Sequence, residues 1–257
     1  MNSTQAIRPA AVAPTSLLVA VAVSAALAWS MVSGDVVRAL PLTLPKVPYL
    51  RSGIATLSDI LVMIGLAAAA ARLSPAGVLS LTGVTELRRK HLIWTGLVFG
   101  PVVMAAALLA PLASNLTATD FVWPGVVAPF AEELFYRGLA VGLLMRLAGW
   151  RFLPAVLWPA VFFGLAHLWQ GNSPTETAMA VAITGIGGLG FGWLFVRWGF
   201  ALWPAIFLHI GMNSLWTAFA LGENAVGGLT GNGLRLATII LAIGLTFWMA
   251  PRPPARA

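Results

Sequence analysis

Cysteine is absent from the chain, so the protein has no disulfide framework, no thiolate metal site and no catalytic thiol. Charged side chains are also scarce, at 9% of residues, whereas soluble domains carry about 25%. Together with 59% hydrophobic residues and a mean hydropathy of +0.89, this deficit indicates a polytopic membrane protein. The apolar runs are long and continuous rather than alternating, so they predict helices instead of a barrel.

We expect an all-α membrane helix bundle of about eight transmembrane helices. Eight apolar segments are long enough to span a membrane, at roughly 20 residues each. No separate soluble domain fits between them. The segments lie near Ser16–Ser33, Ile54–Ala71, Leu92–Leu112, Pro124–Leu147, Phe152–Leu168, Met179–Trp198, Leu202–Leu221 and Gly233–Met249.

The basic residues predict the orientation of these spans. The net charge of +7 is distributed over short loops without a recognition helix, so we expect no nucleic-acid partner. Ten Lys and Arg residues fall on the side that the two termini share and four on the other side, while Arg137 lies within a span. Because cytoplasmic loops carry the excess of Lys and Arg, both termini are predicted to be cytoplasmic.

Two further features are interpreted as structural. The connection Ser74–His91 ends in a basic stretch, so we expect a loop or a short helix on the membrane surface, with His91 solvated. The pattern Gly185–Gly190 matches a dinucleotide-binding fingerprint, but it lacks the preceding strand and the later acidic residue. We expect the glycines, including Gly188 and Gly192, to permit close packing of membrane helices instead.

Two adjacent carboxylates in the fourth apolar segment are the most informative feature. A charged side chain near the centre of a spanning helix costs roughly 2.5–3.5 kcal/mol on the gentler insertion scale. Glu133 and Arg137 are four residues apart and share a helix face, so Arg137 is the expected partner of Glu133. Glu132 is turned about 100° away from Glu133 and is free to point elsewhere.

Polar side chains in two other apolar segments accompany these carboxylates. Phe163 and His167 are four residues apart in one segment, and His209 and Asn213 are four apart in another. At 1.5 Å per residue, Glu132, His167 and His209 lie about 6 to about 18 Å from the external helix ends. They are therefore expected to share a layer in the outer half of the membrane.

Such a layer is compatible with several functions. A carboxylate and an imidazole can activate water, and a second imidazole with an amide can stabilise an oxyanion, so the set suits amide hydrolysis. Glu132, His167 and His209 are also able to bind zinc with one open position, although no HExxH helix is present. A proton or ion pathway and a structural polar network remain as alternatives.

The order of these residues resembles a known family. Glu132-Glu133-x-x-x-Arg137, Phe163-x-x-x-His167 and His209-x-x-x-Asn213, on separate spans, are similar to the three signatures of the CPBP (Abi) intramembrane proteases. That family includes CAAX prenyl endopeptidases and bacterial proteins linked to bacteriocin processing and immunity. The resemblance implies a protease that acts on membrane-embedded or membrane-associated polypeptides within the lipid bilayer.

The resemblance also implies roles for individual residues. Glu132 would activate water with the assistance of His167, while His209 and Asn213 would form the oxyanion hole. Glu133 and Arg137 would order the site, and Phe163 would support it. Metal-independent and zinc-dependent mechanisms both remain open. The alternatives within the family fold are a non-catalytic scaffold or bacteriocin-immunity protein.

The resemblance further implies a domain organisation and a location. We expect residues 122–220 to form the catalytic core, 1–121 to hold the first three spans, and 221–257 to hold the last span and a basic tail. The expected location is a bacterial or archaeal cytoplasmic membrane. CAAX endopeptidases act from the cytoplasmic side, whereas the loop charges place this site nearer the external face, so prenylated substrates are not assigned.

Overall fold

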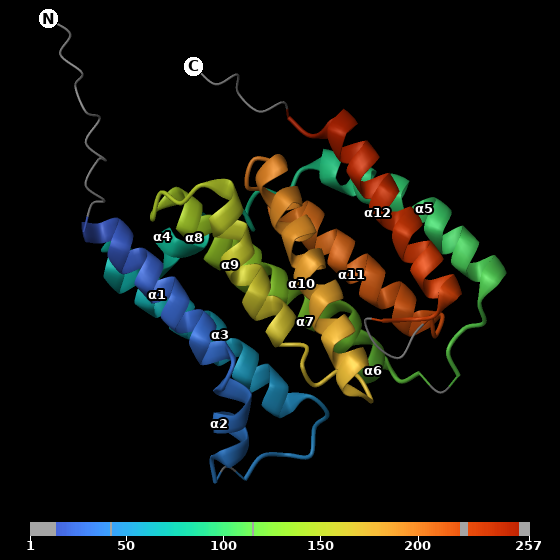
Figure 1. Ribbon diagram of the computed structural model, residues 1–257, viewed down its shortest axis with the longest axis horizontal. Helices are drawn as coiled ribbons and strands as arrows, with labels where there is room; N and C mark the ends of the chain where they lie inside the picture. The colour runs from blue at the N-terminus through green and yellow to red at the C-terminus, as the bar shows by residue number, and fades with distance from the viewer. Residues whose placement is uncertain (1–13, 42, 115, 222–225, 252–257) are drawn as a thin grey trace, which may run out of the picture.

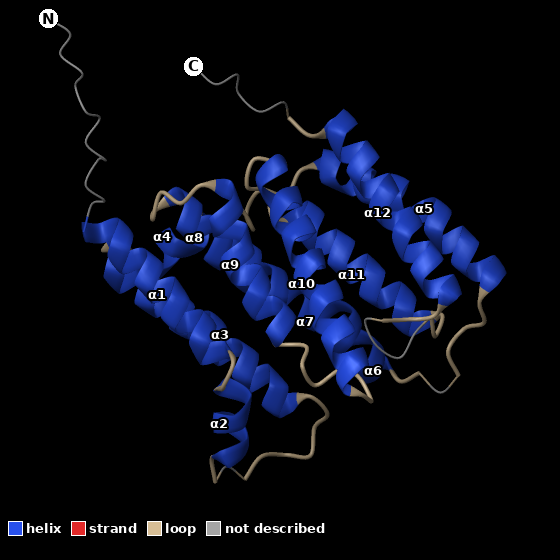
Figure 2. Cartoon of the chain, in the orientation of Figure 1, coloured by secondary structure: helices blue, strands red, loops and turns tan. Residues whose placement is uncertain are grey.

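All regular elements of the described chain are helices, which confirms the all-α prediction (Figure 2). The computed structural model describes residues 14–41, 43–114, 116–221 and 226–251. In chain order, the elements are α1 (Pro14–Ser30), α2 (Ser33–Ala39), α3 (Leu50–Ala71), α4 (Pro75–Ser80), α5 (Arg89–Leu109), α6 (Ala118–Val122), η1 (Trp123–Val127), α7 (Ala128–Glu132), η2 (Glu133–Val141), α8 (Gly142–Arg146), α9 (Phe152–Leu165), α10 (Pro174–Arg197), α11 (Trp203–Ala218) and α12 (Leu229–Met249).

Five of these elements follow one another without a gap and form one long helix, Ala118–Arg146, which we call the motif helix. Thr117 caps its start, because its hydroxyl accepts a hydrogen bond from the Asp120 backbone N–H at 3.1 Å. Two parts of it, η1 and η2, are π-helical, with backbone bonds that reach five residues back. Such wide turns are rare and are frequent at functional sites.

The helices are arranged as two outer pairs around a central group (Figure 1). The pair α1 and α3 lies on one side, and the pair α5 and α12 lies on the other. Between them stand the motif helix, α9, α10 and α11. One apolar core joins α1 and α3 to the motif helix and α9, and a second joins α5 and α12 to α10 and α11. The central helices therefore have packed neighbours on both sides.

The predicted count of eight spans is not confirmed. All eight expected segments fall on helices, but within the described residues four helices are long and apolar enough to cross a membrane, or five if the bent pair α1 and α2 forms one span. A span needs about 20 residues, whereas α9 has 14 and α11 has 16. The start of α1 and the end of α12 lie on the same side of the bundle (Figure 1).

The outer helices expose large apolar side chains. Leu108 is 85% exposed, Trp248 is 76% exposed and Phe247 is 65% exposed. An apolar surface of this extent is unfavourable in water but suits contact with lipid tails. Together with the apolar helices, it identifies an integral membrane protein.

The glycine pattern is part of a close helix contact rather than a nucleotide loop. Residues 185–190 lie inside α10. A Cβ added at Gly192 would sit 2.4 Å from Val156 Cγ1, and one added at Gly188 would sit 3.1 Å from Ala160 Cβ. The absence of side chains therefore lets α10 approach α9 closely, as the sequence predicted.

The expectation that His91 is solvated is wrong. The His91 side chain is fully buried, although it lies near the start of α5. Its Nδ1 accepts a hydrogen bond from the Arg88 backbone N–H at 3.3 Å, and its ring meets Trp198 edge-on with centroids 5.2 Å apart. The packing of α5 against the end of α10 covers this histidine, which local composition does not reveal.

The glycine contact predicts different effects for two similar substitutions. Gly192→Ala places a methyl group against Val156, so we expect the unfolding midpoint to fall, by an overpacking cost of about 1–3 kcal/mol. Gly187→Ala is the matched control, because a Cβ there meets no atom within 4 Å. Thermal unfolding in detergent, followed by circular dichroism, measures both. Equal midpoints for the two variants would contradict the close contact.

Candidate active site

Glu133 and Arg137 form a buried ion pair inside the motif helix. Arg137 Nη1 lies 3.0 Å from Glu133 Oε1, and their side chains are 2% and 0% exposed, respectively. The four-residue spacing brings both groups to one side of the helix, even though η2 is π-helical. Each charge therefore offsets part of the desolvation cost of the other.

Arg137 is held mainly by aromatic rings. Its Cζ lies 4.3 Å from the ring centroid of Phe163, 5.1 Å from that of Phe191 and 5.9 Å from that of Tyr136. These distances are within the range of about 6 Å for cation–π attraction. Neither terminal nitrogen has an aligned hydrogen bond within the described chain, so the contact with Glu133 is an electrostatic pair. Among these rings, that of Phe163 lies closest to the guanidinium.

His209 connects the two adjacent carboxylates. Its Nδ1 lies 2.8 Å from Glu133 Oε1, and its Nε2 lies 3.8 Å from Glu132 Oε2. An ionised carboxylate only accepts hydrogen bonds, so Nδ1 carries the hydrogen and donates it to Glu133. This bond fixes the ring and turns Nε2 toward Glu132. Helix α11 is thereby attached to the motif helix at its two carboxylates.

Phe191 of α10 is a contributor that the sequence reasoning missed. Its ring stacks on His209 with centroids 5.0 Å apart and an interplanar angle of 29°. The same ring lies over Arg137, as described above. Phe191 follows the closely packed Gly188 by three residues, but nothing in the sequence around it distinguishes it from other apolar residues. Only the helix contact reveals its position.

His167 lies in the turn just beyond the end of α9. Its Nδ1 is 2.7 Å from the Phe163 carbonyl oxygen, which the helix end leaves without a backbone donor. A carbonyl only accepts, so Nδ1–H donates and Nε2 is left as an acceptor. The rings of His167 and Phe163 meet edge-on with centroids 4.9 Å apart. Within the described residues, no hydrogen bond or ion pair joins His167 to Glu132.

Asn213 lies one turn beyond His209 on α11, but its amide is engaged elsewhere. Its Nδ2 donates to the Pro124 carbonyl oxygen at 3.1 Å, in the first π-helical part of the motif helix. One of the two amide hydrogens is therefore used for a helix contact. The second hydrogen remains for another acceptor.

The three groups considered as zinc ligands are not gathered. Among the described residues, no group of three or more His, Cys, Asp or Glu side chains is placed to hold a metal ion. The donors present do not fit a three-ligand zinc site, and we derive no step through a metal.

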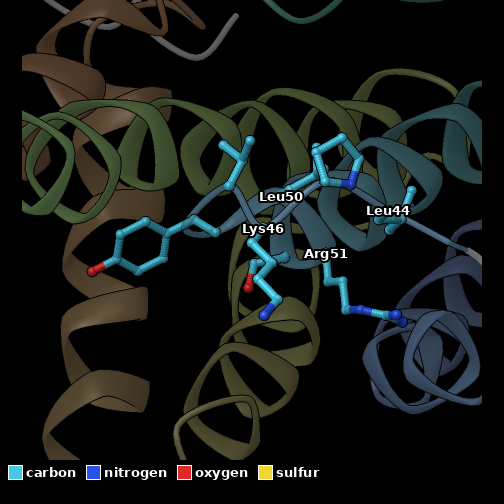
Figure 3. Close-up of a pocket in the computed structure, with 8 residues that line it drawn as sticks. Leu44, Lys46, Leu50 and Arg51 are labelled. Atoms are coloured by element: carbon cyan, nitrogen blue, oxygen red, sulfur yellow. The ribbon is translucent and has the colours of Figure 1, made fainter.

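A hollow on the surface is separate from this site. Its volume is about 420 Å³, and it lies on the connection between α2 and α3 (Figure 3). The residues that line it include Lys46, Tyr49 and Arg51, but none of the predicted site residues. The hollow therefore does not bear on the chemistry of the carboxylates.

The two carboxylates have different environments. The Glu132 side chain is 32% exposed, whereas Glu133 is fully buried. Ionised Glu132, Glu133 and Arg137 sum to one negative charge, so a proton on His209 would make the set neutral. A buried set that approaches neutrality is less costly in a membrane.

Comparison with protein families locates a match over the central part of the chain. Residues 114–215 match the model described as type II CAAX prenyl endopeptidase Rce1-like. The CPBP resemblance is confirmed. Every predicted site residue lies within the Rce1-like segment, and the match supports a membrane peptidase of the CAAX type. Comparison with curated proteins and with solved structures gives no significant match.

The buried ion pair predicts non-additive effects of mutation. Arg137→Met leaves the Glu133 charge without compensation, so we expect a loss of about 3–5 kcal/mol in unfolding free energy. Adding Glu133→Gln to that variant should recover part of the loss, because it removes the uncompensated charge. Chemical denaturation in micelles measures the full double-mutant cycle.

An exposed pair provides the control for that cycle. Arg88 Nη2 and Glu86 Oε2 lie 2.7 Å apart, with side chains 63% and 49% exposed. Arg88→Met and Glu86→Gln should each change stability by less than about 1 kcal/mol. Additive losses for Arg137→Met and Glu133→Gln would contradict the proposed compensation.

Proposed function

We propose that the protein is an intramembrane endopeptidase of the CPBP type. The observation that carries the proposal is the buried hydrogen bond from His209 to Glu133, which directs the other ring nitrogen toward Glu132. An oriented imidazole beside a more accessible carboxylate is a common arrangement for acid–base chemistry. The family match of this segment supports the same class of reaction.

In the proposed reaction, Glu132 accepts a proton from a water molecule. The resulting hydroxide attacks the carbonyl carbon of the scissile peptide bond, and the carbonyl oxygen becomes an oxyanion. The C–N bond then breaks, and the proton held by Glu132 passes to the leaving amine. His167 would assist Glu132 through its Nε2, since its Nδ1 is occupied by the Phe163 carbonyl.

The oxyanion would receive hydrogen bonds from α11. His209 donates through Nε2 when the ring is protonated, and the buried Glu133 stabilises the positive charge on that ring. The second amide hydrogen of Asn213 would be the other donor. Glu133 and Arg137 would fix the ring without contacting the substrate, and the substrate would be a polypeptide in or at the bilayer. We propose residues 122–220 as the core that performs this reaction.

The decisive test removes the proposed base. Glu132→Gln keeps the shape of the side chain, so we expect normal folding and a loss of cleavage of at least about 100-fold. Glu86→Gln is the control, because Glu86 lies in an exposed pair. Membrane proteomes of cells with the wild type and each variant are compared for missing cleavage products. Full cleavage by the Glu132→Gln variant would exclude the mechanism. If the variant instead restored the normal phenotype of cells that lack the protein, the scaffold alternative would be favoured.

Chelation tests the arrangement of the donors. Because Glu132, His167 and His209 are not gathered for metal binding, we expect a zinc chelator to leave the cleavage rate of the purified protein unchanged. The rate is measured with the native membrane substrate in micelles, before and after zinc is added back. A rate that falls with chelation and returns only with zinc would contradict this prediction.

A further inference from the structure

Pro129 of the motif helix removes a backbone donor close to the site. Proline has no N–H, so it cannot bond to the carbonyl four residues earlier in an α-helix or five residues earlier in a π-helix. These two carbonyls belong to Gly125 and Pro124. In the adjacent π turn, the Ala128 N–H bonds to the Trp123 carbonyl, so Pro129 is the next donor in that series and is missing.

Two consecutive side chains of α11 bond to these same two carbonyls. Asn213 Nδ2 donates to the Pro124 oxygen at 3.1 Å, and Ser214 Oγ donates to the Gly125 oxygen at 3.1 Å. Whichever of the two carbonyls Pro129 leaves without its donor is therefore satisfied from a neighbouring helix. A buried carbonyl without any donor would be destabilising in a membrane.

The backbone at this contact also fits the arrangement. A Cβ added at Gly125 would lie 3.1 Å from Ser214 Oγ and 3.5 Å from Ser214 Cα. The absence of a side chain at Gly125 thus permits α11 to come close enough for the two hydrogen bonds. Gly125, Pro129 and the polar pair on α11 form one complementary contact.

We infer that Asn213 and Ser214 are positioning residues that replace the missing Pro129 donor and thereby set the placement of His209 against Glu132 and Glu133. The inference rests on the proposed function for its effect on catalysis. Asn213 and His209 are one turn apart on α11, so a shift of α11 at Pro124 moves the imidazole as well. Together with the bond between His209 and Glu133, the contact attaches α11 to the motif helix at two levels.

The test uses proline replacement to restore the donor. Ser214→Ala removes the hydrogen bond from α11 to the Gly125 carbonyl, and we expect kcat to fall about tenfold while KM is unchanged. Pro129→Ala supplies a backbone N–H, so the double variant should regain at least half of the kcat of Pro129→Ala alone. When Pro129→Ala is added to Asn213→Ala, the stability of the protein should also be regained. The kcat should recover only in part, because the second amide hydrogen of Asn213 is still missing.

A control variant separates this effect from a general loss of hydroxyl groups on α11. Thr217 Oγ1 donates to the Asn213 carbonyl at 2.8 Å within the same helix. Thr217→Val removes that bond, but it leaves the carbonyls near Pro129 unchanged. Pro129→Ala should therefore give no recovery of a Thr217→Val variant. Equal recovery of the Thr217→Val and Ser214→Ala variants would overturn the inference.

A spectroscopic readout keeps the inference independent of the proposed activity. The ¹⁵N resonance of His209 Nδ1, assigned with a His209→Gln variant, reports its hydrogen bond to Glu133. We expect it to shift in Ser214→Ala and to return toward its original value in the double variant with Pro129→Ala. A resonance that Ser214→Ala does not shift, or that Pro129→Ala does not restore, overturns the positioning role, whether or not the protein is a peptidase.

Discussion

The buried pair of Glu133 and Arg137 is the constraint on which the other features of the site depend. Two charges with no more than 2% exposure are costly to desolvate. Their mutual attraction offsets that cost only when neighbouring groups also interact favourably with both charges. The structure supplies such surroundings from several helices, with three aromatic rings around the guanidinium and an imidazole on the carboxylate. Side chains of α9, α10 and α11 therefore all contact this pair on the motif helix.

Close approach of α9 and α10 makes the aromatic surroundings available. The contact depends on glycines of α10 that face α9, such as Gly188 and Gly192. It places Phe163 of α9 and Phe191 of α10 against the same guanidinium, and Phe191 also stacks on His209. A packing feature with no polar atoms thus determines the environment of the Arg137 charge and contributes to the position of the His209 ring. This is an example of helix packing, rather than local sequence, that shapes a polar site.

The features predictable from sequence were those encoded within one segment. The spacing of Glu133 and Arg137 predicted their contact, because side chains four residues apart are neighbours on the surface of an α-helix. The contact partner of Asn213 and the burial of His91 depend on other helices, and the sequence gives no local signal for either. The π turns of the motif helix were also unpredictable, since both π-helical and α-helical residues can share the same composition. The number of spans could not be decided from apolar segments alone, because two of them form helices of only 14 and 16 residues.

The contrast between two adjacent glutamates indicates how one short sequence combines order with reactivity. Glu133 is fully buried and bonded to His209, so it contributes a fixed negative charge that orients the ring. Glu132 is 32% exposed and lies 3.8 Å from the other ring nitrogen, so it is the more accessible of the two carboxylates. An exposed pair of carboxylates would not hold an imidazole in place, and a fully buried pair would have no access to water. The helix rotation between consecutive residues separates these two environments, and the proposed hydrolysis uses both of them.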